Sequence, residues 1–300
     1  MSPARFDRTR PLRPLREAAL LLAVTLALFW LARSAGQALA YDWDWSVIPQ
    51  FLAFRDPDTG AWRTGRILAG LFTTLRLSLW AGALALVLGT LAGLMRGSGR
   101  LFWRLTGGSY VLSVRNAPPL VLIFLFSFFL GAPLVNALGL DARLAALPEG
   151  LRPALELLLG PVGQIPAFAS AVVTLGLIEG AYMAEIVRAG VASIEPGQWD
   201  AAHALGFTRA GALRNVILPQ AFRRMLPPLT GQFVSTVKDS AIVSVISIPE
   251  LAFQAQELVS ATYRSFEVWT LVLALYLLLT LPCSLAARWL EIRLTRSDRD

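Results

Sequence analysis

Long apolar runs constrain this 300-residue chain more than any other feature. Several reach the roughly 20 residues that an α-helix needs to cross a hydrocarbon core of about 30 Å. Lipid offers no hydrogen bonds to the backbone, and helices satisfy their own backbone groups within each run. Hydrophobic residues make up 55% of the chain, and its mean hydropathy is +0.57, above the usual range for a soluble domain. The sequence therefore predicts an all-α polytopic membrane protein.

About six transmembrane helices are expected, which places both termini on the same side of the membrane. The runs are 18–32, 67–95, 111–135, 165–189, 226–251 and 266–290. The first also has features of a cleavable signal peptide, because residues 1–16 are basic and Ala38-Leu39-Ala40 follows the run. An uncleaved membrane anchor fits the topology of the other runs. For residues 1–40, both an anchor and a cleaved signal peptide remain open.

The net charge of +7 gathers in four arginine-rich segments rather than over the whole chain. These segments lie at 5–16, 96–104, 209–224 and 288–299. All four fall on one side of the six-span topology, as expected for loops and termini held in the cytoplasm. This pattern argues against a nucleic-acid partner. With Cys283 and His203 as the sole cysteine and histidine, a disulfide and Cys- or His-rich metal sites are excluded.

Two polar segments are expected on the outer side. The first, 37–66, contains Asp56-Pro57-Asp58-Thr59-Gly60, whose composition predicts a tight turn. The second, 136–163, is interrupted by prolines, and 151–159 is expected to form a short helix on the membrane surface. Arg76 is interpreted as lying near this outer interface.

The polar stretch from Glu185 to Pro219 is longer than a turn between two spans requires, which indicates a docking surface for another protein. Small alanines near 201 permit close approach of a partner. Gly206 is expected to end a first short helix, and Thr208 to cap a second one. Leu213, Val216 and Ile217 are expected to pack inward, and Pro219 to end this second helix.

The chain has neither a GxxxxGK[ST] phosphate loop nor a Ser-His-Asp arrangement. It is therefore not expected to be an enzyme. If transport through it is driven by ATP, another subunit must supply the ATPase.

The polar stretch resembles the cytoplasmic signature of permease subunits of ATP-binding-cassette (ABC) importers, which is E-A-A, three residues, G, nine residues, an aliphatic residue, one residue and L-P. Asp200-Ala201-Ala202, Gly206, Val216 and Leu218-Pro219 have this spacing, with Asp200 in place of glutamate. The resemblance implies a type I ABC importer permease core (MetI-like) with a cytoplasmic coupling helix. The implied ATPase-coupling residues are Gly197, Gln198, Asp200, Ala201, Ala202, Gly206, Leu218 and Pro219.

Three further segments are similar to the polar amino acid subfamily of these permeases. Residues 180–190, followed by Gly197-Gln198, match its G-A-Y-x-A-E-I-x-R-x-G and G-Q patterns. Residues 115–121 resemble R-G-T-P-L-L-V, with departures that include Asn116 and Ala117, and residues 238–242 resemble K-D-T-S-L, with substitutions after the shared Lys238-Asp239. The likeness covers about 68–288. It implies an N-terminal part at 1–66, a permease domain at 67–291 with its coupling loop at about 190–222, and a cytoplasmic tail at 292–300.

The function implied by the resemblance is ATP-driven import of polar amino acids such as glutamate, aspartate or glutamine, or of L-amino acids generally. The implied partners are an ABC ATPase subunit, a second permease subunit, a solute-binding protein outside the cell, the amino acid and the lipid bilayer. No cofactor is expected in this chain, since ATP and Mg would be bound by the ATPase. The implied location is the cell inner membrane, with both termini cytoplasmic.

Charged residues inside membrane spans mark functional sites, because they are costly in lipid. The candidate residues of a substrate path or gate are Arg115, Pro118, Glu179, Tyr182, Lys238 and Asp239. Lys238 and Asp239 are equally open to a structural ion pair with another helix, although adjacent residues on a helix point in different directions. Glu185 and Arg188, three residues apart, are expected to form a salt bridge that braces the root of the loop.

A second function remains open, namely a stand-alone ion-coupled secondary transporter that uses Lys238 and Asp239 as a relay. Such transporters often carry repeated halves. The two halves of this chain show no convincing repeat, which favours the importer.

Overall fold

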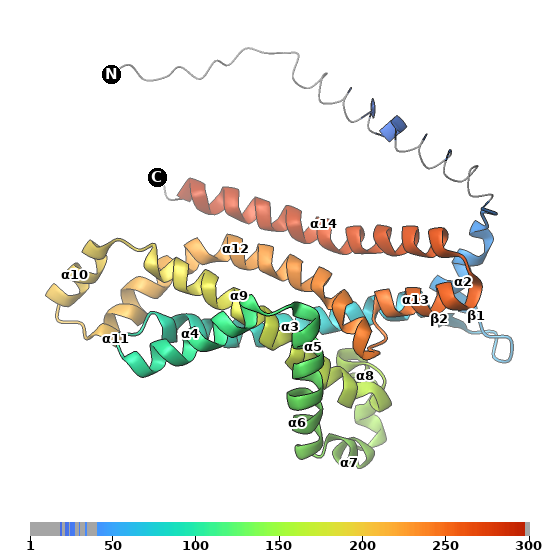
Figure 1. Ribbon diagram of the computed structural model, residues 1–300, viewed down its shortest axis with the longest axis horizontal. Coiled ribbons are helices and arrows are strands. Elements are labelled where there is room, and N and C mark those ends of the chain that lie inside the picture. Colours follow the sequence, from blue (N-terminus) through green and yellow to red (C-terminus); the bar gives the residue numbers. More distant parts are fainter. Residues whose placement is uncertain are drawn as a thin grey trace. The chain divides into compact units, whose positions relative to one another are not determined.

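The computed structural model describes residues 41–297, together with a few separate residues between 19 and 34. Ser46–Asp300 forms one compact unit, which is almost entirely helical (Figure 1). The expected tail at 1–16 and about half of the expected first span lie outside the described residues. The question of an anchor or a cleaved signal at 1–40 therefore stays open.

Two long helices form the centre of the unit, α3 (Arg66–Arg96) and α9 (Ile165–Ala192). They match the expected second and fourth spans. Small residues let the two backbones approach closely: a Cβ added at Gly89 would lie 2.6 Å from Met183 Cβ, and one at Gly93 would lie 2.7 Å from the Ala184 carbonyl oxygen. Such close contacts are typical of helix pairs in membranes.

The predicted start of the third span, expected at 111–135, is wrong. Helix α4 (Leu101–Asn116) ends before the two prolines, and α5 (Pro119–Phe126) starts a separate span that continues through a π-helical turn (Ser127–Gly131) and α6 (Ala132–Ala137). Ala117 is extended (φ −94°, ψ 148°), because a residue that precedes proline is driven out of the helical region. Arg115 thus lies at the end of α4 rather than inside the span.

The expected fifth span, 226–251, is also corrected. Helix α12 (Leu218–Asp239) passes into a 3₁₀ segment (Ser240–Ile246), and α13 (Leu251–Thr262) begins after a break. The two parts meet at 49°. Ser247 adopts a left-handed conformation (φ 61°), and Pro249 lacks an N–H, so a regular helix cannot continue through this point.

The last helix, α14 (Ser265–Ser297), contains the expected sixth span and runs well into the segment expected to be a tail at 292–300. In the described part of the chain, four helices are long and apolar enough to cross a membrane, or five if the bent pair counts as one span. The expected total of six depends on 18–32.

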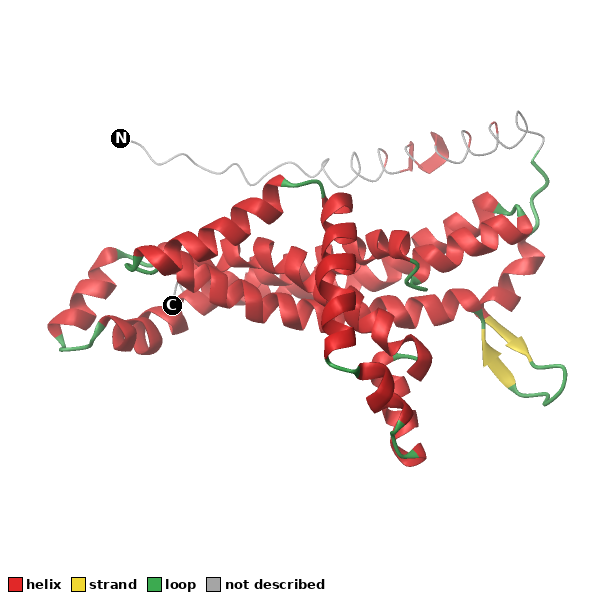
Figure 2. Ribbon diagram, turned by 60° about the horizontal axis from the view of Figure 1, so that its bottom comes forward, coloured by secondary structure: helices red, strands yellow, loops and turns green. Residues whose placement is uncertain are grey.

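The two segments expected on the outer side contain short elements. A 3₁₀ turn (Trp45–Val47) and α2 (Ile48–Leu52) lead into a hairpin of β1 (Ala53–Arg55) and β2 (Trp62–Thr64), which stands apart from the helices (Figure 2). The strands were not expected, but the turn between them is confirmed: Asp58 N donates to Asp56 Oδ1 at 2.9 Å. Beyond α6 follow α7 (Leu140–Ala145), a 3₁₀ turn (Glu149–Leu151), α8 (Arg152–Leu159) and another 3₁₀ turn (Val162–Gln164).

The short helix expected at 151–159 is confirmed as α8, and two side chains of α3 hold its end. Arg76 Nε donates to the Leu157 carbonyl at 2.9 Å, and Trp80 Nε1 to that of Leu158 at 3.0 Å. Carbonyls at the end of a helix lack partners within the helix. Arg76 therefore has a structural role in the half of α3 that lies away from the coupling loop.

Candidate functional site

The coupling loop folds into two short helices at the end of α9 (Figure 1). They are α10 (Pro196–Ala204) and α11 (Arg209–Ala212), which continues as a π-helical turn (Leu213–Ile217). Gly206 follows α10 with a φ of +82°, which favours glycine. Thr208 Oγ1 accepts a hydrogen bond from Gly211 N at 3.2 Å. The expected helix end and the expected cap are both confirmed.

The two alanines of the signature face in opposite directions. Ala202 is buried, whereas Ala201, Gly197, Gln198 and Asp200 are exposed. The exposed side of α10 is thus small and polar, which leaves it open to another protein.

Trp199 attaches α10 to the membrane helices, a role that the sequence did not reveal. It packs against a core formed by the end of α9, the π-helical turn and the start of α12, including Ile194, Ile217 and Met225. Val216 and Leu213 are partly buried there, and Ile217 is fully buried, as expected. Movement of α10 would therefore be transmitted to both α9 and α12.

Pro219 does not end the second helix, contrary to expectation. The chain remains helical from the π-helical turn into α12, where Leu218 and Pro219 form the first residues. Proline is tolerated in the first turn of an α-helix, where its missing N–H removes no essential bond.

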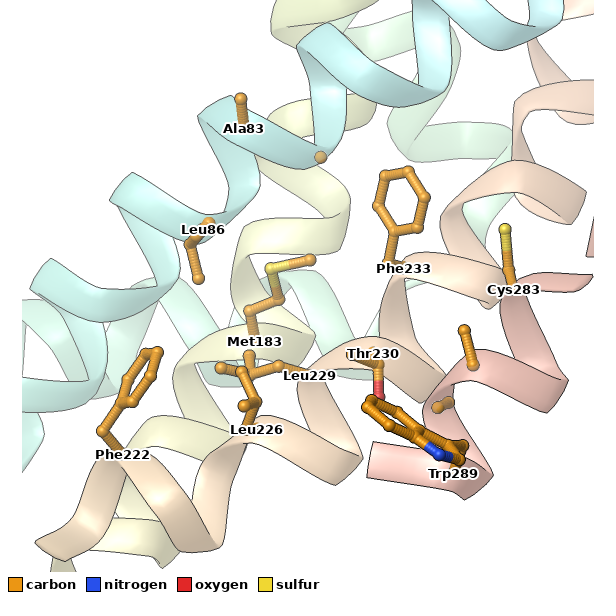
Figure 3. A pocket seen from close by; sticks show the side chains of 13 residues that line it. Ala83, Leu86, Met183, Phe222, Leu226, Leu229, Thr230, Phe233, Cys283 and Trp289 are labelled. Atoms are coloured by element: carbon orange, nitrogen blue, oxygen red, sulfur yellow. The ribbon is translucent and has the colours of Figure 1, made fainter. Parts of the chain in front are cut away.

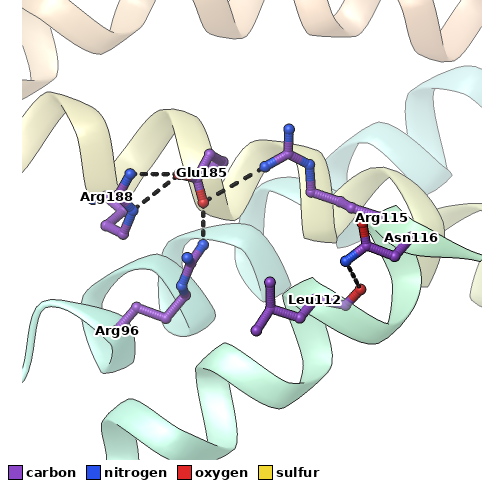
Figure 4. A network of polar contacts seen from close by, with 6 residues as sticks. All are labelled: Arg96, Leu112, Arg115, Asn116, Glu185 and Arg188. Carbon is purple, nitrogen blue, oxygen red and sulfur yellow. Dashed lines mark hydrogen bonds and ion pairs between the residues drawn. The ribbon is translucent and has the colours of Figure 1, made fainter.

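The expected pair of Glu185 and Arg188 is confirmed and belongs to a larger cluster (Figure 4). Arg188 Nε donates to Glu185 Oε1 at 3.1 Å, while Arg96 Nη1 donates to Glu185 Oε2. Arg115 Nη1 lies 3.7 Å from the same oxygen. This Glu185 cluster (Glu185, Arg188, Arg96 and Arg115) joins α9 to the end of α3 and the end of α4.

Arg115 and Tyr182, two candidate residues of the substrate path, lie at this cluster. The Arg115 guanidinium lies 5.6 Å from the centre of the Tyr182 ring, a cation–π distance. Pro118 is exposed at the break between α4 and α5. In this structure Arg115 thus connects α4 to α9, whereas Pro118 only marks the break between α4 and α5.

Glu179 has different surroundings and is only 1% exposed. Its Oε2 accepts hydrogen bonds from Gln232 Nε2 at 2.8 Å and from Thr236 Oγ1 at 3.0 Å. Both donors come from α12 and are uncharged. Gln232 and Thr236 were missed in the sequence because nothing local connects them to a glutamate more than 50 residues earlier.

Lys238 and Asp239 do not act as a unit. Asp239 is half-buried and lies close enough to Glu179 for the two carboxyl groups to interact, whereas Lys238 is exposed. Within the described residues the two side chains form no salt bridge with each other. The structure therefore brings together Glu179, Asp239, Gln232 and Thr236, here called the Glu179 cluster, and leaves Lys238 outside it.

A cavity of about 590 Å³ lies beside these groups but is almost wholly apolar (Figure 3). Its walls come from α3, α9, α12 and α14, with Phe222, Phe233 and Trp289 among the largest side chains. Cys283 lies in its wall, and none of the charged candidate residues reaches it. An apolar cavity gives no binding partner to a charged solute.

Glu250 was not singled out in the sequence, yet it is fully buried at the start of α13. Its carboxylate accepts from Phe253 N at 2.7 Å, Ala252 N at 2.9 Å and Tyr276 Oη at 3.0 Å. It thus caps α13 and joins it to α14 at the 49° bend.

Comparison with known proteins gives consistent matches. Residues 85–296 match the family described as the binding-protein-dependent transport system inner membrane component. The glutamine transport system permease protein GlnP of Escherichia coli K12 is 36% identical over 222 residues, covering 73% of this chain and 90% of GlnP. The glutamate/aspartate import permease protein GltJ of the same strain is 31% identical over 241 residues, covering 80% of this chain and 90% of GltJ.

Solved structures agree with this result. A crystal structure of an amino acid ABC transporter with histidines has a chain 34% identical to this one, with a TM-score of 0.59 over 76% of this chain and 94% of that chain. The inward-facing MetNI methionine ABC transporter, at 18% identity and a TM-score of 0.57, shares the fold and covers 76% of this chain and 96% of its own.

Proposed function

The chain belongs to the family of inner membrane components of binding-protein-dependent transport systems, and we propose that it is the permease subunit of an ABC importer for polar amino acids. The observation that carries the proposal is the coupling loop, in which α10, the left-handed Gly206 and α11 reproduce the spacing of the family signature. The names of its relatives, which concern glutamine, glutamate and aspartate, support an amino acid as the substrate.

The Glu179 cluster is the part of the path that binds the polar solute. The carboxyl group of Glu179 forms no salt bridge with a cation among the described residues, so it is available to pair with the α-ammonium group of the solute in a low-dielectric setting. The amide of Gln232 and the hydroxyl of Thr236 fix the orientation of that carboxylate. A second carboxyl group, that of Asp239, lies close enough to interact with the first.

The energy comes from a separate ATPase subunit that binds ATP and Mg. Its contact surface is the exposed side of α10, formed by Gly197, Gln198, Asp200 and Ala201. Trp199 and Ala202 pack inward, so they transmit the movement of α10 to α9 and α12. Since Glu179 lies on α9 and Gln232 on α12, a shift between these helices changes the solute site directly.

The working complex contains two permease subunits, identical or related, together with a solute-binding protein that delivers the amino acid from outside. Both termini of this chain face the cytoplasm, as the distribution of arginine indicates. The rival interpretation, a stand-alone secondary transporter with a Lys238–Asp239 relay, is not favoured, because Lys238 is exposed and lies outside the Glu179 cluster.

Substitution of Ala201 by glutamate tests the proposal, because Ala201 is exposed and the change need not disturb the core. We expect the variant to lose co-purification of the ATPase in mild detergent and ATP-dependent uptake of amino acids in proteoliposomes. Glu257→Gln, a change on the exposed side of α13, is the control and should leave both intact. Uptake that continues without an ATPase subunit, or that is insensitive to ATP depletion, would overturn the importer.

A further inference from the structure

A second cavity, of about 570 Å³, lies between the α3–α4 loop and the coupling loop. The backbone of Gly97, Ser98 and Gly99 lines one side, and α9, α10 and α11 line the others, with Trp199 among the wall residues. It is separate from the Glu179 cluster and borders the Glu185 cluster, because Arg188 contributes to its wall.

The charge of this cavity is positive and is not balanced locally. Arg100, Arg188 and Arg209 line it, and no acidic residue does. Arg188 is already paired with Glu185. Arg209 Nη2 donates one hydrogen bond, at 3.4 Å, to the neutral carbonyl of Gly97. Among the described residues, no salt bridge joins Arg100 or Arg209 to a carboxylate.

A cavity with two unbalanced guanidinium groups selects an anion, and their planar forks match the oxygens of a phosphate. The residues next to Arg100 indicate where that phosphate comes from. Leu101, Phe102 and Leu105 at the start of α4 are exposed by 59%, 69% and 57%. Apolar and aromatic side chains beside arginine are typical of the boundary between lipid and water.

We propose that this cavity binds the phosphate of an anionic phospholipid headgroup, held by Arg100 and Arg209, with the acyl chains against the start of α4. The lipid then connects the α3–α4 loop to α11, which stabilises the coupling loop against the membrane helices. This inference goes beyond the proposed function and does not depend on which solute is carried.

The test is binding of dioleoyl phosphatidylglycerol or phosphatidylcholine to the purified full chain in detergent, measured by native mass spectrometry. We expect phosphatidylglycerol to bind more tightly than phosphatidylcholine. Arg100→Gln should weaken phosphatidylglycerol binding about fivefold, the usual contribution of one arginine near an anionic membrane surface. Arg209→Gln should act in the same direction, and the double variant should lose more than either one.

Arg104→Gln is the matched control, because Arg104 is exposed one turn further along α4 and does not line the cavity. It should bind phosphatidylglycerol as the wild type does. Equal loss in Arg104→Gln and Arg100→Gln, or equal binding of the two lipids, would overturn the proposal. Displacement of phosphatidylglycerol by inorganic phosphate at the same concentration would also overturn it and would assign the cavity to a soluble anion. An unchanged melting temperature of Arg100→Gln excludes misfolding as the cause.

Discussion

Glu179 and Glu185 lie on the same helix, α9, but in opposite electrostatic surroundings. Glu185 contacts three arginines, on α3, α4 and α9 itself. Glu179 is more deeply buried, and its hydrogen bonds come from an amide and a hydroxyl on α12. A carboxylate already paired with cations is suited to hold helices together, whereas one without a cation remains able to bind a cationic group.

This difference divides α9 into two functional parts. The middle of the helix, at the Glu179 cluster, faces the solute path that we propose. Its C-terminal end, at the Glu185 cluster, fixes the root of the coupling loop. Substitutions in the two parts should therefore affect different properties, namely transport in the middle and stability at the end.

The largest effect is expected for Glu179→Gln. The amide keeps the size of the side chain and can still accept from Thr236, but the negative charge is lost. Uptake in proteoliposomes should fall tenfold or more, the equivalent of about 1.4 kcal/mol, with the melting temperature nearly unchanged. Uptake at the wild-type level would show that Glu179 has only a structural role, and it would contradict the functional difference between Glu179 and Glu185.

Glu185→Gln should mainly reduce stability. The substitution leaves Arg96 and Arg188 without their anion. For a fully buried ion pair, removal of one partner lowers the free energy of unfolding by several kcal/mol. Because Glu185 retains 26% side-chain exposure, we expect about 2 kcal/mol. The measurement is reversible unfolding in mixed detergent micelles. Glu195→Gln, at an exposed position just before α10, is the control and should change stability by less than about 0.5 kcal/mol.

A smaller effect is expected at Gly206, beyond the Glu185 cluster. Alanine at a φ of +82° is strained by about 1 kcal/mol, so Gly206→Ala should weaken retention of the ATPase several-fold while leaving the Glu179 cluster intact. Gly108→Ala is the control, because Gly108 lies in α4, outside the coupling loop, and has free space around it. Equal retention by the two variants would contradict the need for a left-handed turn.

The smallest effects on stability are expected for substitutions of the arginines in the Glu185 cluster, and they should differ between Arg188 and Arg115. Arg188→Lys loses the contact that Nε makes with Glu185 and should cost about 0.5–1 kcal/mol, since lysine cannot form a forked contact. Arg115→Lys should be nearly neutral, because Arg115 is half-exposed and its nitrogen lies 3.7 Å from Glu185. A double-mutant cycle with Glu185→Gln measures both; a larger coupling for Arg115 would reverse this ranking.

Sequence patterns predicted the local parts of this structure well. The pair of Glu185 and Arg188 follows from their spacing on one helix, and Gly206 from the need for a left-handed residue after α10. The contacts of Glu179 with Gln232 and of Glu185 with Arg96 could not be predicted, because they depend on how distant helices pack. The breaks at Pro118 and at Ser247 were missed because apolar composition continues through both points, although the prolines nearby were a usable signal.

The most direct test of this division is to measure ATPase retention and ATP-dependent amino acid uptake together in the Glu179→Gln complex. The account predicts a complex that keeps its full complement of ATPase subunit but transports at one tenth of the wild-type rate or less. Loss of the ATPase subunit from this variant, or uptake at the wild-type rate, would contradict the assignment of the solute site to the middle of α9.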